Sequence, residues 1–131
     1  MPFDRRLYEL DLVSFVWSEV ATKGDAPPSL QGGSLTFDPV ERVLLLVGGL
    51  RNEPPGPAIS PDVWIFDLQG STWHRVTDKA GVARRDHVAA YDPVGRAHYL
   101  YGGRTSQTVG DFYEIGEPVT GALRIRVRRP R

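Results

Sequence analysis

"AYDPVGRAHYLYGG", residues 90–103, is almost a copy of "TFDPVERVLLLVGG", residues 36–49. The Asp-Pro-Val tripeptide, one arginine and the closing Gly-Gly pair all match at a single offset, and no gap is needed. A match at fixed spacing is typical of repeat architectures, in which each unit is too small to bury its own apolar surface and must stack on the next. Fold and function should therefore be sought in an array of units.

A second pair of segments matches at nearly the same spacing. "LYELDLVSFVWSEV" (7–20) aligns with "VWIFDLQGSTWHRV" (63–76), so that Trp17 corresponds to Trp73. The two matches interleave, and a degraded third copy of the second one, "FYEIG" followed by "ALRIRV", closes the sequence. The repeating unit therefore runs in the order Asp-Pro turn, Gly-Gly, aromatic-Asp, Trp.

Each unit is predicted to form four short strands. "SLTF" and "HVAAY" lead into Asp-Pro, which favours a tight type I turn and hence a hairpin. The next strands, "VLLLV" and "AHYLY", are nearly unbroken apolar runs, as expected of strands covered on both faces, and Gly-Gly gives a sharp exit. "DVWIFDL" and "DFYEIG" are the third strands, and "TWHRV" and "ALRIRV" the fourth. No segment shows the apolar period of a helix over a useful length, so the predicted fold class is all-β.

These motifs resemble the kelch repeat over nearly the whole chain. In that family an Arg-x-x-His start, a Gly-Gly pair, an aromatic residue followed shortly by Asp, and a Trp mark one four-stranded blade of a β-propeller. The residues that carry the resemblance are Arg84-Arg85-Asp86-His87, Gly102-Gly103 and Tyr113 in one unit, and Gly48-Gly49, Trp64, Asp67 and Trp73 in the other. The sequence departs from the pattern at Leu30 and Gly33, where Arg and His would stand, and at Gly116 and Ala122, near the places of Asp and Trp.

The resemblance implies a partial kelch-type β-propeller of about two and a half repeats. We expect a single domain over 1–131, in which 1–20 form the outer two strands of a first blade, 30–76 a second blade and 84–128 a third. Propellers usually close with about four to eight blades, so this chain cannot close a ring alone, and an apolar blade face should be exposed at each end. Three explanations are open: a piece of a longer propeller, assembly with copies of itself, or docking onto a blade of another protein. The start inside a unit favours the first or the third.

Composition excludes several classes of protein. The 131 residues include 16 Lys and Arg, 16 Asp and Glu and no cysteine, so neither an overall basic charge nor thiol chemistry is present. No apolar stretch approaches the roughly 18 residues of a membrane span, and the first ten residues lack the apolar run of a signal peptide. We expect a cytoplasmic protein without membrane contact.

No motif for catalysis is found. The three histidines, His74, His87 and His98, are far apart in sequence, so structural roles are favoured over a metal site. Asp11 and Asp67 precede tight turns, where a side-chain oxygen ordinarily accepts hydrogen bonds from turn N–H groups. No Ser-His-acid set or phosphate-binding loop is present. We therefore expect no enzyme activity, no cofactor and no metal.

A binding surface is expected at one end of the array. Strands alternate in direction, so the loops before each first strand and after each Gly-Gly emerge together, and these loops are long and rich in Gly, Pro and charge. Binding residues tend to lie on such loops when a rigid scaffold holds them. The candidates are Arg51, Asn52, Glu53, Lys79, Arg84, Arg85 and Arg104, with a structural contact between blades as the alternative for Arg84.

The C-terminal "RIRVRRPR" is the one charge cluster. Leu123, Ile125 and Val127 alternate with arginines at strand period, which indicates an outer strand with its apolar side inward and its cations outward. Charge of this kind guards an edge strand against unwanted pairing, and we favour that role over an anion-binding patch.

The favoured function is a non-catalytic interaction module that binds a protein partner through loops at one end and completes its propeller with other blades or chains. The alternative is a fragment or subunit of a kelch-type enzyme whose active site lies in the missing blades. A nucleic-acid contact through the arginine tail at 124–131 comes third. The sequence does not identify the partner.

Overall fold

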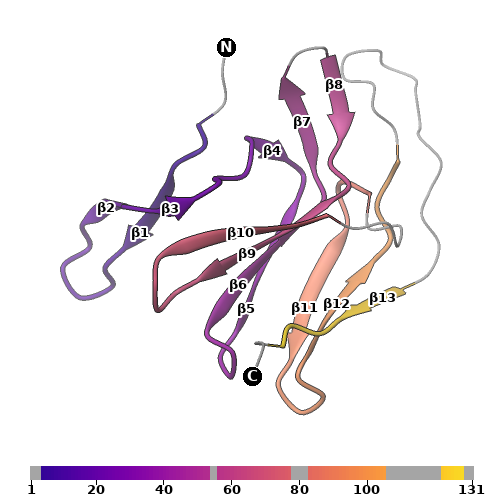
Figure 1. Cartoon of the computed structure of the whole chain (residues 1–131). Helices are drawn as coiled ribbons and strands as arrows, with labels where there is room; N and C mark the ends of the chain where they lie inside the picture. The colour runs from indigo at the N-terminus through magenta and orange to yellow at the C-terminus, as the bar shows by residue number, and fades with distance from the viewer. Residues whose placement is uncertain (1–3, 54–55, 78–82, 106–121, 129–131) are drawn as a thin grey trace.

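The computed structural model describes residues 4–53, 56–77, 83–105 and 122–128. Over these ranges the chain forms strands and no helix, which confirms the all-β prediction. The strands belong to four sheets, and none of these sheets closes on itself. In Figure 1 the N-terminal hairpin, the middle sheet and the C-terminal strands lie side by side in chain order.

The middle sheet contains the unit that the sequence predicts as four strands. These are β5 (Ser34–Asp38), β6 (Val43–Val47), β9 (Asp62–Asp67) and β10 (Thr72–Thr77), each antiparallel to the next, with β3 (Lys23–Gly24) added parallel to β10. The predicted Asp-Pro hairpin is present between β5 and β6. The buried carboxylate of Asp38 accepts hydrogen bonds from the N–H groups of Val40 and Glu41, at 2.9 and 3.0 Å. This side chain fixes the turn and hence the register of the hairpin.

The N-terminal hairpin consists of β1 (Leu7–Leu10) and β2 (Trp17–Val20). Its turn is held by Asp11, whose carboxylate accepts hydrogen bonds from the N–H groups of Val13 and Ser14, both at 2.8 Å. Asp67 accepts one from Gln69 in the same manner, at 3.0 Å. The prediction that these two aspartates cap turns is confirmed.

The C-terminal sheet consists of β11 (Val88–Asp92), β12 (Ala97–Tyr101) and β13 (Ala122–Ile125). The prediction that "ALRIRV" forms a fourth strand was wrong, because β13 pairs directly with β12 and is the third strand of this sheet. Its alternation explains the position, since Leu123 and Ile125 pack against the apolar cluster that β12 already faces. The predicted third strand "DFYEIG", with Tyr113 and Gly116, lies outside the described residues.

A side sheet of three short strands departs from the prediction of a long loop after Gly48-Gly49. Its strands are β4 (Leu30–Gln31), β7 (Leu50–Glu53) and β8 (Gly56–Ile59). Leu50 and Ile59 are paired across β7 and β8, and both are buried. Burial of this apolar pair stabilises a hairpin where Gly and Pro content indicated irregular structure.

Two apolar clusters cover the two faces of the middle sheet. Along β6, Leu45 and Val47 face the C-terminal sheet, whereas Leu44 and Leu46 face the N-terminal hairpin. The prediction that "VLLLV" is covered on both faces is therefore confirmed. The same prediction for "AHYLY" was wrong, because Tyr99 and Tyr101 are exposed, and the described residues cover the opposite face of β12.

Candidate functional site

The Arg-Arg-Asp-His segment before β11 docks against the Gly-Gly turn of the middle sheet. Gly49 donates a backbone hydrogen bond to the carbonyl oxygen of Arg84, at 2.8 Å. Gly48 has a φ of 69°, and a Cβ at this position would overlap the same carbonyl oxygen. Glycine is therefore required twice over, by the left-handed backbone and by the close approach of the following unit.

Arg84 has a structural position. Its side chain is buried, and one guanidinium N–H donates to the carbonyl oxygen of Gly102 at 3.3 Å. Burial lowers the pKa of this guanidinium from its ordinary value. Two roles were considered for Arg84, a binding residue and a structural contact between units. Its position fits the second role, because it contacts both Gly-Gly turns.

Arg85 and Arg104 lie together at the Gly-Gly end of the C-terminal sheet. Their backbones exchange two hydrogen bonds, at 2.8 and 2.9 Å, and the guanidinium of Arg85 lies 3.3 Å from the carboxylate of Asp86. Arg104 is exposed and Arg85 is half-buried. This pair is the part of the predicted loop surface that the structure brings together.

The other candidates lie elsewhere. Arg51 is half-buried in β7, where it pairs with Leu30 on one side and Ala58 on the other. Asn52 and Glu53 follow it in the same strand. Lys79 falls outside the described residues.

The N-terminal hairpin exposes an aromatic face that has an internal counterpart. Trp17 is 66% exposed and pairs with Leu10, whereas its equivalent in the middle sheet, Trp73, is 6% exposed and pairs with Phe66. Tyr8 is also exposed, and its equivalent, Trp64, is buried. In the middle sheet this face packs against the N-terminal hairpin, whereas in the N-terminal hairpin the equivalent face is exposed.

The C-terminal sheet exposes the opposite face. Tyr101 is 62% exposed, whereas its equivalent in β6, Val47, is 1% exposed. Tyr99 and Val88 are exposed as well, although the equivalent of Tyr99 is the buried Leu45. We name the two open surfaces the front face, on β1 and β2, and the back face, on β11, β12 and β13.

The exposed faces were expected to be formed by side chains of the "VLLLV" and "AHYLY" type. The "VLLLV" side chains are covered, whereas Tyr99 and Tyr101 of "AHYLY" are exposed; the exposure of Trp17 was not predicted. The signal was available in the alignment of Trp17 with Trp73, because the equivalent of a buried contact residue is exposed wherever its neighbouring unit is missing.

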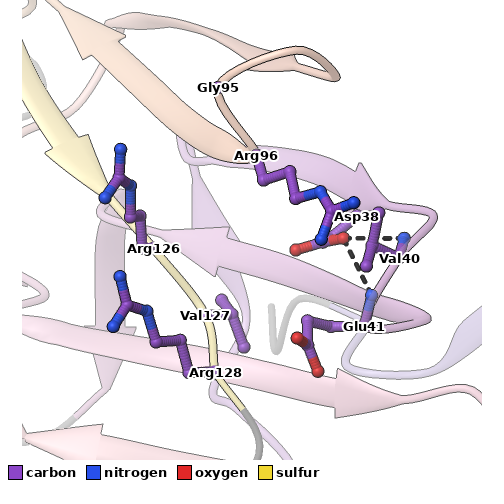
Figure 2. A pocket seen from close by; sticks show the side chains of 8 residues that line it. All are labelled: Asp38, Val40, Glu41, Gly95, Arg96, Arg126, Val127 and Arg128. Carbon is purple, nitrogen blue, oxygen red and sulfur yellow. Dashed lines mark hydrogen bonds between the residues drawn. The ribbon is translucent and has the colours of Figure 1, made fainter.

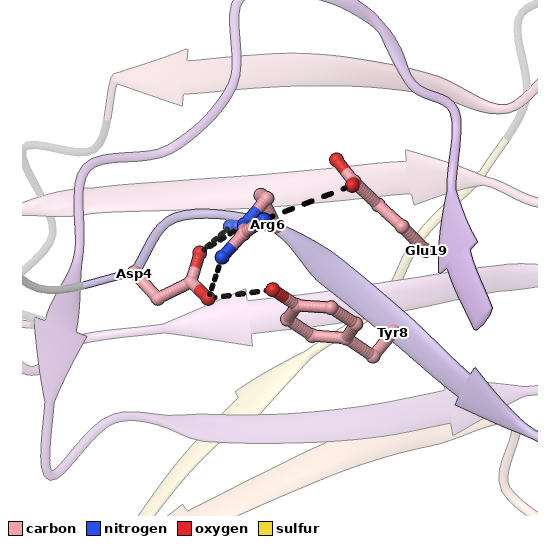
Figure 3. A network of polar contacts seen from close by, with 4 residues as sticks. All are labelled: Asp4, Arg6, Tyr8 and Glu19. Atoms are coloured by element: carbon pink, nitrogen blue, oxygen red, sulfur yellow. Dashed lines mark hydrogen bonds and ion pairs between the residues drawn. The ribbon is translucent and has the colours of Figure 1, made fainter. Parts of the chain in front are cut away.

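A polar network borders the front face (Figure 3). Arg6 donates to Asp4 through two nitrogens, at 2.9 and 3.0 Å, and lies 4.0 Å from the carboxylate of Glu19. The Tyr8 hydroxyl donates to Asp4 at 2.7 Å. These hydrogen bonds, chiefly that from Arg6, hold the pKa of Asp4 well below its usual range. The face therefore presents an aromatic ring whose hydroxyl is hydrogen-bonded to a neighbouring set of exposed charges.

A basic pocket of about 510 Å³ lies between the turns that join β5 to β6 and β11 to β12 and the C-terminal segment (Figure 2). Arg96 reaches from β12's turn toward Asp38, whereas Arg126 and Arg128 project from the C-terminal segment to the other side. The three guanidinium groups do not converge on one point. The pocket is therefore a charged groove without a single anion-binding point. In the C-terminal segment, exposed arginines alternate with the half-buried Leu123, Ile125 and Val127, which confirms the predicted strand period of the tail.

The histidines have the structural surroundings that the sequence favoured. The Nδ1 atom of His98 lies 2.6 Å from the Thr36 hydroxyl, and Nε2 of His87 lies 2.7 Å from the Ser34 hydroxyl. Burial lowers the pKa of both, so both rings are neutral at pH 7. His74 is exposed in β10.

Within the ranges that the structure describes, no group of three or more His, Asp or Glu side chains could hold a metal ion. No helix in those ranges is long and apolar enough to cross a membrane. No protein-family model and no curated protein matches the chain. The resemblance to kelch repeats therefore rests on the sequence motifs alone.

Proposed function

We propose that the chain is a non-catalytic interaction module, a segment of a kelch-type β-propeller that binds protein through surfaces left open by its unclosed array. The middle sheet has the strand order of one blade, and the docking of Arg84 against Gly48-Gly49 is the contact expected between an Arg-x-x-His start and the preceding Gly-Gly turn. Both features support the proposal.

The observation that carries the proposal is the pair of open faces. Trp17 and Tyr101 are exposed, although the residues at the same places in the middle sheet form the core. Exposed apolar surface of this kind marks an interaction site on a protein chain. A hairpin of two strands is also marginally stable by itself, so a partner on the front face would stabilise β1 and β2.

A second surface is proposed at the Gly-Gly end, where Arg85 and Arg104 lie together and Arg51 lies in the side sheet. Charge reversal at the exposed Arg104 should weaken capture of a protein partner and leave the melting temperature unchanged, because exposed substitutions change stability by less than about 0.5 kcal/mol. Gln69→Glu also introduces a negative side chain, but in the exposed turn after β9, and serves as the control.

The direct test is binding of an apolar dye to the chain at dilution. Dye fluorescence should rise in the native chain and fall when Trp17→Lys and Tyr101→Lys are introduced. Val94→Lys is the matched control, because Val94 is an apolar side chain, 92% exposed, in the β11–β12 turn, at the end of the hairpin opposite to the Val88–Tyr101 pair. A native monomer that binds no dye would refute the proposed function.

A further inference from the structure

Two junctions inside the chain use the same pair of faces. At the first, the N-terminal hairpin places Leu7 and Val20 against Trp64, Phe66 and Trp73 of the middle sheet. At the second, the middle sheet places Leu45, Val47 and Val63 against Leu100 and Leu123 of the C-terminal sheet. Val63 is the equivalent of Leu7, so the same side of each unit contacts the next unit.

The two ends of the chain carry one uncovered copy of each face. The front face, with Tyr8, Leu10 and Trp17, corresponds to the side of the middle sheet that receives Leu7 and Val20. The back face, with Val88, Tyr99 and Tyr101, corresponds to the side that carries Leu45 and Val47. The chain therefore displays both halves of a contact that it already makes twice internally.

Gly102 gives independent support for the open back face. Its equivalent, Gly48, is crowded by the carbonyl oxygen of Arg84, but a Cβ at Gly102 would meet no atom within 4 Å. Both glycines have nearly the same φ, 69° and 72°. The turn of the C-terminal sheet is thus shaped like the turn that receives a following unit.

The charges on the two faces are complementary. Arg124 lies across from Tyr99 as Ile65 lies across from Leu45, so the back face has gained a cation. The charged residues beside the front face carry one more net negative charge than their equivalents in the middle sheet, because Asp4, Arg6 and Glu19 stand at the places of Ser60, Asp62 and Arg75. Opposite charges on facing surfaces favour the correct partner and its register.

We propose that the front face of one chain binds the back face of a second copy, which produces a head-to-tail dimer with two identical contacts. This inference rests on the proposed function, because it identifies the partner of the open faces. A head-to-tail contact either closes a ring or extends without limit. Two copies together would hold about five repeats, which lies within the roughly four to eight blades of closed propellers. The chain has no net formal charge that would oppose the association.

Sedimentation of the whole chain over a range of concentrations tests the dimer. The expected result is a reversible change from the mass of one chain to the mass of two. Trp17→Lys and Tyr101→Lys should each weaken the dimer by about thirtyfold or more, as loss of an interface hot spot does, and Val94→Lys should not. A single-chain mass at every concentration, or growth beyond two chains, would overturn the proposal.

Mixing the two variants distinguishes head-to-tail contact from any other dimer. Trp17→Lys keeps an intact back face and Tyr101→Lys an intact front face, so the mixture should recover one contact and form a heterodimer. In one chain, Glu19→Arg or Arg124→Glu alone should weaken association, and the double exchange should restore it. Failure of the mixture to associate more tightly than either variant would contradict the assignment.

The dye separates this inference from the proposed function. A chain that stays monomeric but binds the dye at both faces would refute the second copy as partner and leave the open faces for a different protein. A monomer that binds no dye would refute both.

Discussion

The N-terminal hairpin and the β9–β10 hairpin of the middle sheet share a sequence pattern but differ in their surroundings. In each, a tryptophan on the second strand pairs with an apolar residue on the first, as Trp17 with Leu10 and Trp73 with Phe66. Trp73 packs against Phe66 with ring centroids 4.9 Å apart and is buried, whereas Trp17 is exposed. The local pattern defines the face on which a side chain lies, and the neighbouring unit decides whether that face is covered.

Both hairpins have an ion pair at equivalent positions, but the positions of the cation and the anion are exchanged. Arg75 lies 2.8 Å from Asp62 in the middle sheet, and at the equivalent positions Arg6 lies 4.0 Å from Glu19. In both hairpins the arginine lies over an aromatic ring, Trp64 in one and Tyr8 in the other. The charge of the paired positions is thus exchangeable between units, while the aromatic position is retained.

The largest effect that would test this comparison is expected from the two tryptophans. Trp73→Ala should cost about 3–5 kcal/mol, because it removes a buried aromatic side chain from the cluster beneath the N-terminal hairpin. Trp17→Ala should change the free energy of unfolding of the monomer by less than about 0.5 kcal/mol. Urea denaturation at dilution measures both. Equal losses for the two variants would show that the hairpins have the same surroundings.

The next effect concerns the equivalent glycines. Gly102→Ala should cost about 1–2 kcal/mol, the penalty for a left-handed backbone with a Cβ. Gly48→Ala should cost more than about 3 kcal/mol, because the Cβ would in addition displace the Arg84 carbonyl. Thermal denaturation of the two variants gives the difference. A Gly102 variant as damaged as the Gly48 variant would place a covering segment on the back face.

The smallest effect is a pH dependence. Burial lowers the pKa of His87 and His98 below the ordinary value of 6.5, so on acidification the unfolded chain takes up protons before the folded chain does. The free energy of unfolding is therefore highest above about pH 6.5. As the pH decreases below this value, the free energy of unfolding decreases by at most about 1.4 kcal/mol per pH unit for each histidine.

His98→Leu reproduces the residue of the preceding unit, Leu44, and should reduce the slope of stability against pH on the acid side. Denaturation midpoints measured between neutral and mildly acid pH provide the slope. A slope unchanged by the substitution would mean that His98 titrates in the folded chain as it does in the unfolded chain.

Much of the middle sheet could be predicted from its sequence, because period and turn chemistry act locally. The Asp-Pro turn at Asp38, the doubly covered β6 and the capping of turns by Asp11 and Asp67 all follow from neighbouring residues. The all-β class follows from the same signals.

The place of β13 and the exposure of Tyr99 and Tyr101 could not be predicted in this manner. The place of β13 depends on which segment pairs with the free edge of β12, and the alternation of residues 122–128 fits a third strand as well as a fourth. The exposure of the tyrosines depends on whether another segment covers their face of β12. The side sheet was missed because Gly and Pro in 54–57 indicate a loop, and the burial of Leu50 and Ile59 that stabilises it is a tertiary effect.

Arg85 and Arg104 were both among the candidate binding residues, but their contact was not predicted, and sequence reasoning could not separate exposed from buried arginines. Arg84 and Arg85 are adjacent and chemically identical, and only the packing of the segment against Gly48 makes one buried. Whether the exposed arginines bind a partner stays a prediction.

Hydroxyl-radical footprinting of the dilute native chain tests the central claim most directly, because it compares equivalent residues within one molecule without substitution. Trp17 should be oxidised far faster than Trp73 and Trp64, in line with their exposed fractions. As the concentration rises, Trp17 and Tyr101 should become protected together, since each covers the other in the proposed dimer. Equal oxidation of Trp17 and Trp73 in the dilute chain would contradict the account, because the front face would then not be open.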